Sequence, residues 1–131
     1  MRIVGIGVDA TEIARIVAIY ERNSESFLAR VYTPREREYC MAKKNFGESL
    51  AARWAAKEAV MKALGTGWAK GVAWNDIETI NLPSGAPALE LKGGALQVAR
   101  ELGIVEWKIS LTHTRTEAIA YVVAIGNDNL S

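Results

Sequence analysis

The chain has 131 residues, of which 50% are hydrophobic and 24% are charged, a composition typical of a folded domain and not of a disordered segment. A chain of this length has room for one domain with a sizeable core, so we expect residues 1–131 to form a single domain. Sixteen Lys and Arg against fifteen Asp and Glu leave a net charge of +1, which argues against a general nucleic-acid binder.

The chain has one cysteine, Cys40, which excludes an intramolecular disulfide and a cysteine metal cluster and fits a reducing compartment. The longest apolar run, around 118–125, is too short to span a bilayer, and the amino terminus lacks the features of a secretion signal. We therefore expect a soluble cytoplasmic protein without a membrane contact, in which Cys40 is a packing residue.

The amino-terminal segment begins with an apolar run over 3–8, which predicts a buried strand that delivers Asp9 at its carboxyl end. Gly5 and Gly7 within this run allow another backbone or a ligand to come close. The period then changes and predicts a helix over 11–22 that carries arginines on its outer face, followed by a second short helix after position 24.

Two further helices are predicted in the middle of the chain. Thr33-Pro34-Arg35-Glu36 is a helix start in which Thr33 caps the helix and Glu36 completes a capping box. A long alanine-rich helix follows over 48–64 and is ended by Gly65.

The remaining sequence is typical of strands that are separated by turns. Alternating and apolar runs predict strands over 77–80, 88–91, 105–112 and 117–125, with a helix over 95–102. The short connection over 113–116 predicts a hairpin. The chain is therefore expected to be α+β, with a small, mostly antiparallel sheet.

The long helix carries the most informative pattern. A helical period puts Leu50, Trp54, Met61 and Leu64 on the expected core face, and Ala51, Ala55, Glu58 and Lys62 on an adjacent stripe. Small residues beside a carboxylate and an amine leave space that suits a ligand. The alternative is an exposed Glu58–Lys62 pair at i, i+4.

Three other positions could carry chemistry. Asp9 either caps the following helix or converges with Glu58 to give two hard oxygen ligands, which suit Mg²⁺ shared with phosphate oxygens. His113, the only histidine, is either a surface residue or part of a site. Thr66, between Gly65 and Gly67, could hold a phosphate, although a helix C-terminal turn explains it equally well.

Several segments resemble the holo-acyl-carrier-protein synthases, which are small 4'-phosphopantetheinyl transferases of fatty-acid synthesis. The resemblance covers nearly the whole chain in the family's order, and it is carried by Gly5-Ile6-Gly7-Val8-Asp9, Trp54-Ala55-Ala56-Lys57-Glu58-Ala59, Gly65-Thr66-Gly67 and Ile109-Ser110-Leu111-Thr112-His113-Thr114. It implies the family fold, with the sheet packed on a long central helix.

The resemblance implies transfer of the phosphopantetheine arm of coenzyme A to a serine of apo acyl carrier protein, with release of adenosine 3',5'-bisphosphate. Asp9 and Glu58 match the family's Mg²⁺ ligands, Lys62 matches a lysine near the pyrophosphate, and His113 matches a histidine at the coenzyme A site. The serine proton could pass to Glu58, Lys62 or a metal-bound water. The family usually forms homotrimers with sites between subunits, so His113 and Asp9 could come from different chains.

The resemblance also implies that the outward arginines contact the carrier protein. Arg15 matches a family arginine that contacts the acidic carrier, and Arg22 lies two turns later on the same stripe. One departure is Ala86, which stands where many family members have a basic residue near the nucleotide. The main alternative from another class is a catalytically silent module that binds coenzyme A or a carrier, and another possibility is a polyketide or peptidyl carrier as the acceptor.

Overall fold

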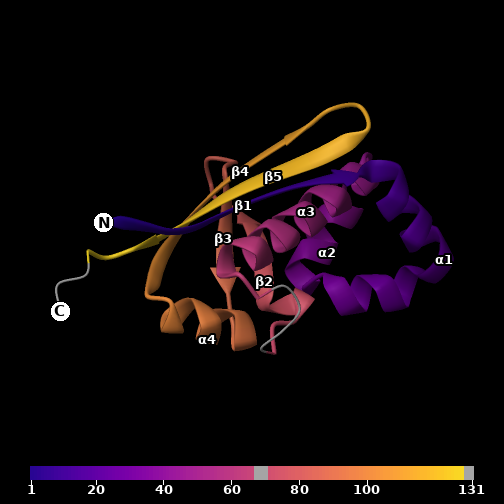
Figure 1. Cartoon of the computed structure of the whole chain (residues 1–131). Helices are drawn as coiled ribbons and strands as arrows, with labels where there is room; N and C mark the ends of the chain where they lie inside the picture. The colour runs from indigo at the N-terminus through magenta and orange to yellow at the C-terminus, as the bar shows by residue number, and fades with distance from the viewer. Residues whose placement is uncertain (67–70, 129–131) are drawn as a thin grey trace.

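The computed structural model describes residues 1–66 and 71–128 (Figure 1). Its elements in chain order are β1 (Arg2–Glu12), α1 (Ile13–Val31), α2 (Pro34–Met41), α3 (Phe46–Leu64), a 3₁₀ turn (Trp74–Asp76), β2 (Ile77–Asn81), β3 (Pro87–Leu91), α4 (Gly93–Glu101), β4 (Ile104–His113) and β5 (Glu117–Gly126). The mixture of helices and antiparallel strands confirms the predicted α+β class.

The strands form two antiparallel sheets, not the one small sheet that was expected. β1, β5 and β4 lie in that order in a three-stranded sheet, and β2 pairs with β3 in a two-stranded one. The predicted hairpin between β4 and β5 is confirmed, and its turn is closed by the Thr114 amide, which donates to the Glu117 carbonyl at 2.8 Å. Asp9 lies opposite Ala120, so these two residues share one face of the sheet.

The long helix α3 packs along the three-stranded sheet, with α1 at the end of the molecule away from both chain termini (Figure 1). A methyl group at Gly7 would lie 1.9 Å from the Ala59 carbonyl oxygen, and one at Gly5 would lie 2.4 Å from that of Ala63. The close backbone approach predicted for the two glycines is therefore confirmed, and the neighbouring backbone is that of α3.

The expected buried strand is exposed on one face. β1 is longer than predicted, and Ile3, Ile6 and Val8 are 51–60% exposed because they point away from α3. The following helix begins at Ile13 and not at residue 11, since residues 10–12 still pair with β5. Asp9 is consequently too early to cap this helix, and that alternative is wrong.

The predicted break between two helices in the first helical region is confirmed. Asn23 has φ −143° and ψ 48°, which kinks α1 in its middle. The capping box of α2 is also confirmed, with the Thr33 hydroxyl and the Glu36 carboxylate each accepting from the other residue's backbone amide. Gly65 ends α3 in the left-handed conformation with φ 76°, as its sequence position predicts.

The helix α3 is buried on nearly every side, so a single core face describes it poorly. Ala51 and Ala55 are fully buried, which means that the small-residue stripe lies inside the protein and does not line open space. Trp54, assigned to the core face, is only half-buried. Cys40 is fully buried, and burial raises the pKa of its thiol to about 11, which confirms a packing role.

Candidate active site

Asp9, Glu58 and Lys62 are brought together where β1 crosses α3. The Lys62 Nζ lies 3.2 Å from Asp9 Oδ1 and donates to the Val8 carbonyl at 2.9 Å. The Thr11 hydroxyl donates to the other Asp9 oxygen at 2.6 Å. Glu58 lies one turn before Lys62 on α3, so β1 supplies one carboxylate of the cluster and α3 supplies the other together with the amine.

The electrostatics of Glu58 show that the two carboxylates act on each other. Burial raises the pKa of Glu58, the negative charge of Asp9 raises it further, and the positive charges of Lys62 and Arg15 lower it. The contact of Lys62 with Asp9 at 3.2 Å shows that the Glu58–Lys62 pair is not an isolated surface pair, and the charge of Asp9 acts on Glu58.

This cluster fits a divalent cation that is shared with a substrate. Two mutually repelling carboxylates provide hard oxygen ligands, and Mg²⁺ typically takes one or two carboxylates together with phosphate oxygens and waters. Within residues 1–66 and 71–128, no group of three or more His, Cys, Asp and Glu side chains could hold a metal by itself. The remaining ligands would have to come from substrate and solvent.

Arg15 and Arg22 are both exposed on the first half of α1, as predicted. The guanidinium carbon of Arg15 lies 5.4 Å from the centre of the Trp54 ring, and its charge acts on Glu58. The kink in α1 follows Arg22 directly, and a cavity of about 270 Å³ at the kink is lined by Ile19, Asn23, Ser26, Phe27 and Arg30. The exposed face of α1 therefore combines arginines with a partly apolar hollow.

His113 lies at the end of β4, apart from the acidic cluster. Its Nδ1 is 3.3 Å from the Glu48 carboxylate, in the first turn of α3. Glu48 and Glu58 are ten residues apart on this helix, a separation of about 15 Å at 1.5 Å per residue. Within one chain, His113 therefore contacts Glu48 and not Glu58.

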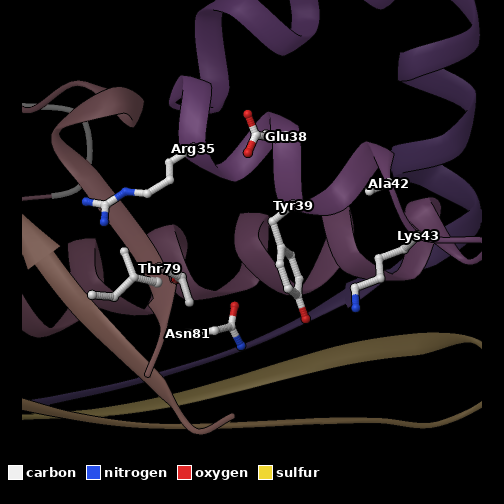
Figure 2. A pocket seen from close by; sticks show the side chains of 8 residues that line it. Arg35, Glu38, Tyr39, Ala42, Lys43, Thr79 and Asn81 are labelled. Carbon is white, nitrogen blue, oxygen red and sulfur yellow. The ribbon is translucent and has the colours of Figure 1, made fainter. Parts of the chain in front are cut away.

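The pocket beside His113, to which Arg53 contributes a positive charge, was not predicted from the sequence. Tyr39 and Arg53 line the small cavity that contains His113, and Tyr39 also lines a larger one of about 480 Å³ with Lys43 and Asn81 (Figure 2). Two cations lie close to the Tyr39 ring, with Arg53 Cζ at 4.3 Å and Lys43 Nζ at 4.6 Å from its centre.

Arg53 is only 4% exposed and donates to the Asn81 side chain at 2.8 Å. Its Nε is buried and has no hydrogen-bond partner among the described residues. An unsatisfied buried donor in a basic pocket suits an anionic ligand. The sequence signal was an arginine nine residues, or about two and a half turns, before Lys62 on the same helix, which spacing alone does not distinguish from a surface charge.

The segment that was expected to contact a phosphate, Gly65 and Thr66, directly follows α3. The Gly65 amide donates to the Met61 and Lys62 carbonyls, which is the helix-ending role that was left open in the sequence analysis. Thr66 is half-buried, and Gly67 lies outside the described residues. The turn before β3 brings no charge at Ala86, whose carbonyl accepts from the Leu82 amide at 2.9 Å.

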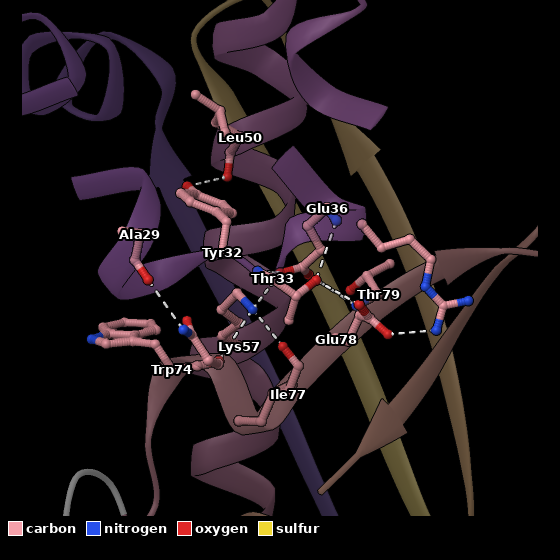
Figure 3. A network of polar contacts seen from close by, with 12 residues as sticks. Ala29, Tyr32, Thr33, Glu36, Leu50, Lys57, Trp74, Ile77, Glu78 and Thr79 are labelled. Carbon is pink, nitrogen blue, oxygen red and sulfur yellow. Dashed lines mark hydrogen bonds and ion pairs between the residues drawn. The ribbon is translucent and has the colours of Figure 1, made fainter. Parts of the chain in front are cut away.

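A buried ion pair lies where α3 packs against α2 and β2 (Figure 3). Lys57 and Glu36 have fully buried side chains, and Lys57 Nζ donates to Glu36 Oε1 at 2.7 Å, to the Trp74 carbonyl at 3.2 Å and to the Ile77 carbonyl. Glu36 also accepts from the backbone amides of Thr33 and Thr79. The pair therefore joins α2, α3 and β2 next to Glu58.

The comparisons with known proteins agree with this geometry. A family model described as the 4'-phosphopantetheinyl transferase superfamily matches residues 5–122, which defines the class of protein as a phosphopantetheinyl transferase. The holo-[acyl-carrier-protein] synthase of Gloeobacter violaceus is 48% identical over 122 residues, covering 92% of each chain. That of Solibacter usitatus is 48% identical over 121 residues, covering 92% of this chain and 97% of the relative.

Solved structures give the same result. The holo-[acyl-carrier-protein] synthase of Neisseria meningitidis matches with a TM-score of 0.87 and 30% identity over 95% of this chain and 99% of the other. The enzyme of Helicobacter pylori, solved in complex with coenzyme A, matches with a TM-score of 0.81 and 33% identity over 92% of this chain and 99% of the other. The chain belongs to the holo-[acyl-carrier-protein] synthase family, and its enzyme class is that of the phosphopantetheinyl transferases.

Proposed function

We propose that residues 1–131 act as one Mg²⁺-dependent domain that transfers 4'-phosphopantetheine from coenzyme A to a serine of apo acyl carrier protein in fatty-acid synthesis. The observation that carries this proposal is the meeting of Asp9, Glu58 and Lys62, two carboxylates and one ammonium from separate elements. The fully buried thiol of Cys40 and the lack, in the described part of the chain, of a helix long and apolar enough to cross a membrane support a cytoplasmic location.

In this reaction the serine oxygen attacks the β-phosphorus of coenzyme A, and the bond to the bridging oxygen breaks to release adenosine 3',5'-bisphosphate while the serine loses its proton. Asp9 and Glu58 would hold Mg²⁺, which would supply positive charge where negative charge develops on the diphosphate. Lys62, whose Nζ lies 3.2 Å from Asp9, would add a second positive charge beside the diphosphate. Thr11 fixes the Asp9 carboxylate by its hydrogen bond.

The nucleotide end of coenzyme A would bind the basic pocket that includes His113, Tyr39 and Arg53. Arg53, whose Nε has no hydrogen-bond partner among the described residues, would offer positive charge to a phosphate group, and Tyr39 with its two neighbouring cations would suit a partly anionic, partly planar ligand. Lys43 would add a positive charge in the larger cavity that shares Tyr39 with this pocket, and Ala86 adds none.

A homotrimer would bring the two halves of this site together. His113 contacts Glu48, which lies about 15 Å along α3 from Glu58, so we propose that each acidic cluster faces the His113 pocket of a neighbouring subunit. The outer face of the sheet supports assembly, because Ile6, Val8 and Tyr121 are 46–58% exposed on adjacent strands. Such an apolar face is typical of a surface that another chain covers.

The carrier would dock on α1. Arg15 and Arg22 offer positive charge to an acidic carrier, and the hollow at the kink offers apolar surface to it. The charge of Arg15 also acts on Glu58, so a carrier held there would present its serine near the acidic cluster. The charge reversal Arg15→Glu should raise KM for the carrier much more than KM for coenzyme A; equal effects would contradict docking through α1.

The decisive experiment is to mix the protein with apo carrier, coenzyme A and Mg²⁺ and to weigh the carrier. We expect a gain of one phosphopantetheine group, and no gain would leave only a binding module. Asp9→Asn and Glu58→Gln should each lower the rate by about 10²-fold or more with the fold intact. Glu101→Gln is the matched control, because this exposed carboxylate lies on α4, outside the site. Near-parental activity in either site variant would contradict the assignment.

A further inference from the structure

Trp54 lies on the same stripe of α3 as the proposed catalytic residues. Trp54, Glu58 and Lys62 follow one another at intervals of four residues, so their side chains share one helix face. The helical period predicts Trp54 on the core face, but its side chain is only half-buried. An aromatic ring therefore lies one turn from Glu58 at the border between the core and the surface.

The Trp54 ring is held in place from its buried side. Its centre lies 4.3 Å from that of Trp74, with 31° between the planes, and 6.0 Å from that of Phe27. Trp74 is itself buried, and its carbonyl accepts from Lys57 of the buried ion pair. The position of the Trp54 ring is thus fixed by α1, by α3 and by the 3₁₀ turn before β2.

Arg15 lies over this fixed ring. Its guanidinium carbon is 5.4 Å from the ring centre, within the range of a cation–π contact. Among the described residues Arg15 makes no ion pair and no hydrogen bond, although its charge acts on Glu58. A guanidinium that lies over an aromatic ring keeps its N–H groups available, so these donors remain free for an external carboxylate.

We propose that Trp54 is a positioning residue, whose indole holds Arg15 beside Glu58 in the orientation that receives a carboxylate of the carrier. This inference rests on the proposed docking role of Arg15. A long arginine side chain on an exposed helix otherwise loses rotamer freedom when it binds, and the fixed indole removes part of that loss before the carrier arrives. Trp54 therefore acts on carrier affinity through Arg15, without touching the reacting atoms.

A double-mutant cycle tests the inference, with KM for apo carrier and for coenzyme A measured in the parent, Arg15→Ala, Trp54→Leu and the double variant. Trp54→Leu should raise KM for the carrier by roughly 2- to 5-fold, the range of an exposed cation–π contact, and leave KM for coenzyme A unchanged. In the Arg15→Ala background the same substitution should have no further effect on carrier KM. Trp107→Leu is the matched control, because Trp107 is a half-buried indole on β4.

The outcomes separate the two proposals. Independent, multiplicative effects of Arg15→Ala and Trp54→Leu on carrier KM would overturn the positioning role while leaving Arg15 as a docking residue. A parental carrier KM in Arg15→Ala would overturn the docking role and this inference with it. If thermal unfolding shows that Trp54→Leu is not folded, the cycle is run with Trp54→Phe, which keeps a weaker ring face and should give a smaller effect that again disappears without Arg15.

Discussion

Replacing Lys57 with methionine should destabilise the fold strongly, because it leaves a buried carboxylate without its cation. Glu36 and Lys57 both have side chains with 0% exposure, and the ammonium donates to Glu36 and to two backbone carbonyls. After the substitution, the partners that Glu36 keeps among the described residues are the backbone amides of Thr33 and Thr79. The charge cannot reach water without opening the contact between α2 and α3.

Removing one partner of a buried ion pair typically costs about 3–5 kcal/mol. The total free energy of unfolding of a domain is about 5–15 kcal/mol, so this loss is a large share of it. For a chain of this size, the midpoint of thermal unfolding should fall by roughly 10–20 °C. A double variant, Lys57→Met with Glu36→Gln, should recover part of the loss, since the neutral side chain removes the unpaired buried charge and its oxygen can still accept from a backbone amide.

Urea unfolding followed by circular dichroism measures these differences at a constant m-value. Arg35→Ala is the control, because the Arg35–Glu78 pair is at the surface, with the arginine side chain 62% exposed, and should contribute about 0–1 kcal/mol. A Lys57→Met variant that loses no more stability than Arg35→Ala would refute the reasoning. So would a double variant that is less stable than Lys57→Met.

Three further predictions concern the site and its assembly. Gly7→Ala should destabilise the fold by about 1–3 kcal/mol and lower activity, because its methyl group would lie 1.9 Å from the Ala59 carbonyl and push β1 from α3; parental unfolding and turnover would contradict this. Burial and a neighbouring carboxylate raise the pKa of Glu58, so its ionisation costs stability as pH rises through that raised value. Metal-free Glu58→Gln should therefore unfold at a higher temperature than the parent at pH 7 but not below pH 4.5, the ordinary value for a glutamate; an equal or lower midpoint at pH 7 would count against it. Tyr121→Lys should shift the protein to smaller species in sedimentation, and an unchanged mass would argue against assembly through the sheet face.

Local sequence signals predicted the elements well. The capping box at Thr33 and Glu36 and the left-handed cap at Gly65 depend on residues within one helical turn, so the sequence contains all their partners. The break at Asn23 and the hairpin after His113 were predicted for the same reason. One expectation that failed was the burial of β1, because its apolar run does not show that only one face of the strand packs against the rest of the chain.

Long-range contacts could not be predicted in this way. Lys57 gives no sign in the sequence that it is buried, since its partner Glu36 lies 21 residues earlier on another helix. The basic pocket around Arg53 combines α2, α3 and the end of β4, and no spacing rule connects them. The side of Trp54 was also missed, because α3 is buried on nearly all sides and its period therefore carries little information.

The contact of Gly5 and Gly7 with Ala59 and Ala63 has a consequence for how this family can vary. Main-chain atoms touch there, so substitutions elsewhere in the core do not enter this contact, whereas a side chain at Gly5 or Gly7 would push β1 away from α3. The separation between Asp9 on β1 and Glu58 on α3 is therefore less sensitive to substitutions in the rest of the core. With glycine kept at these two positions, Asp9 and Glu58 would keep the separation at which we propose that they hold one ion.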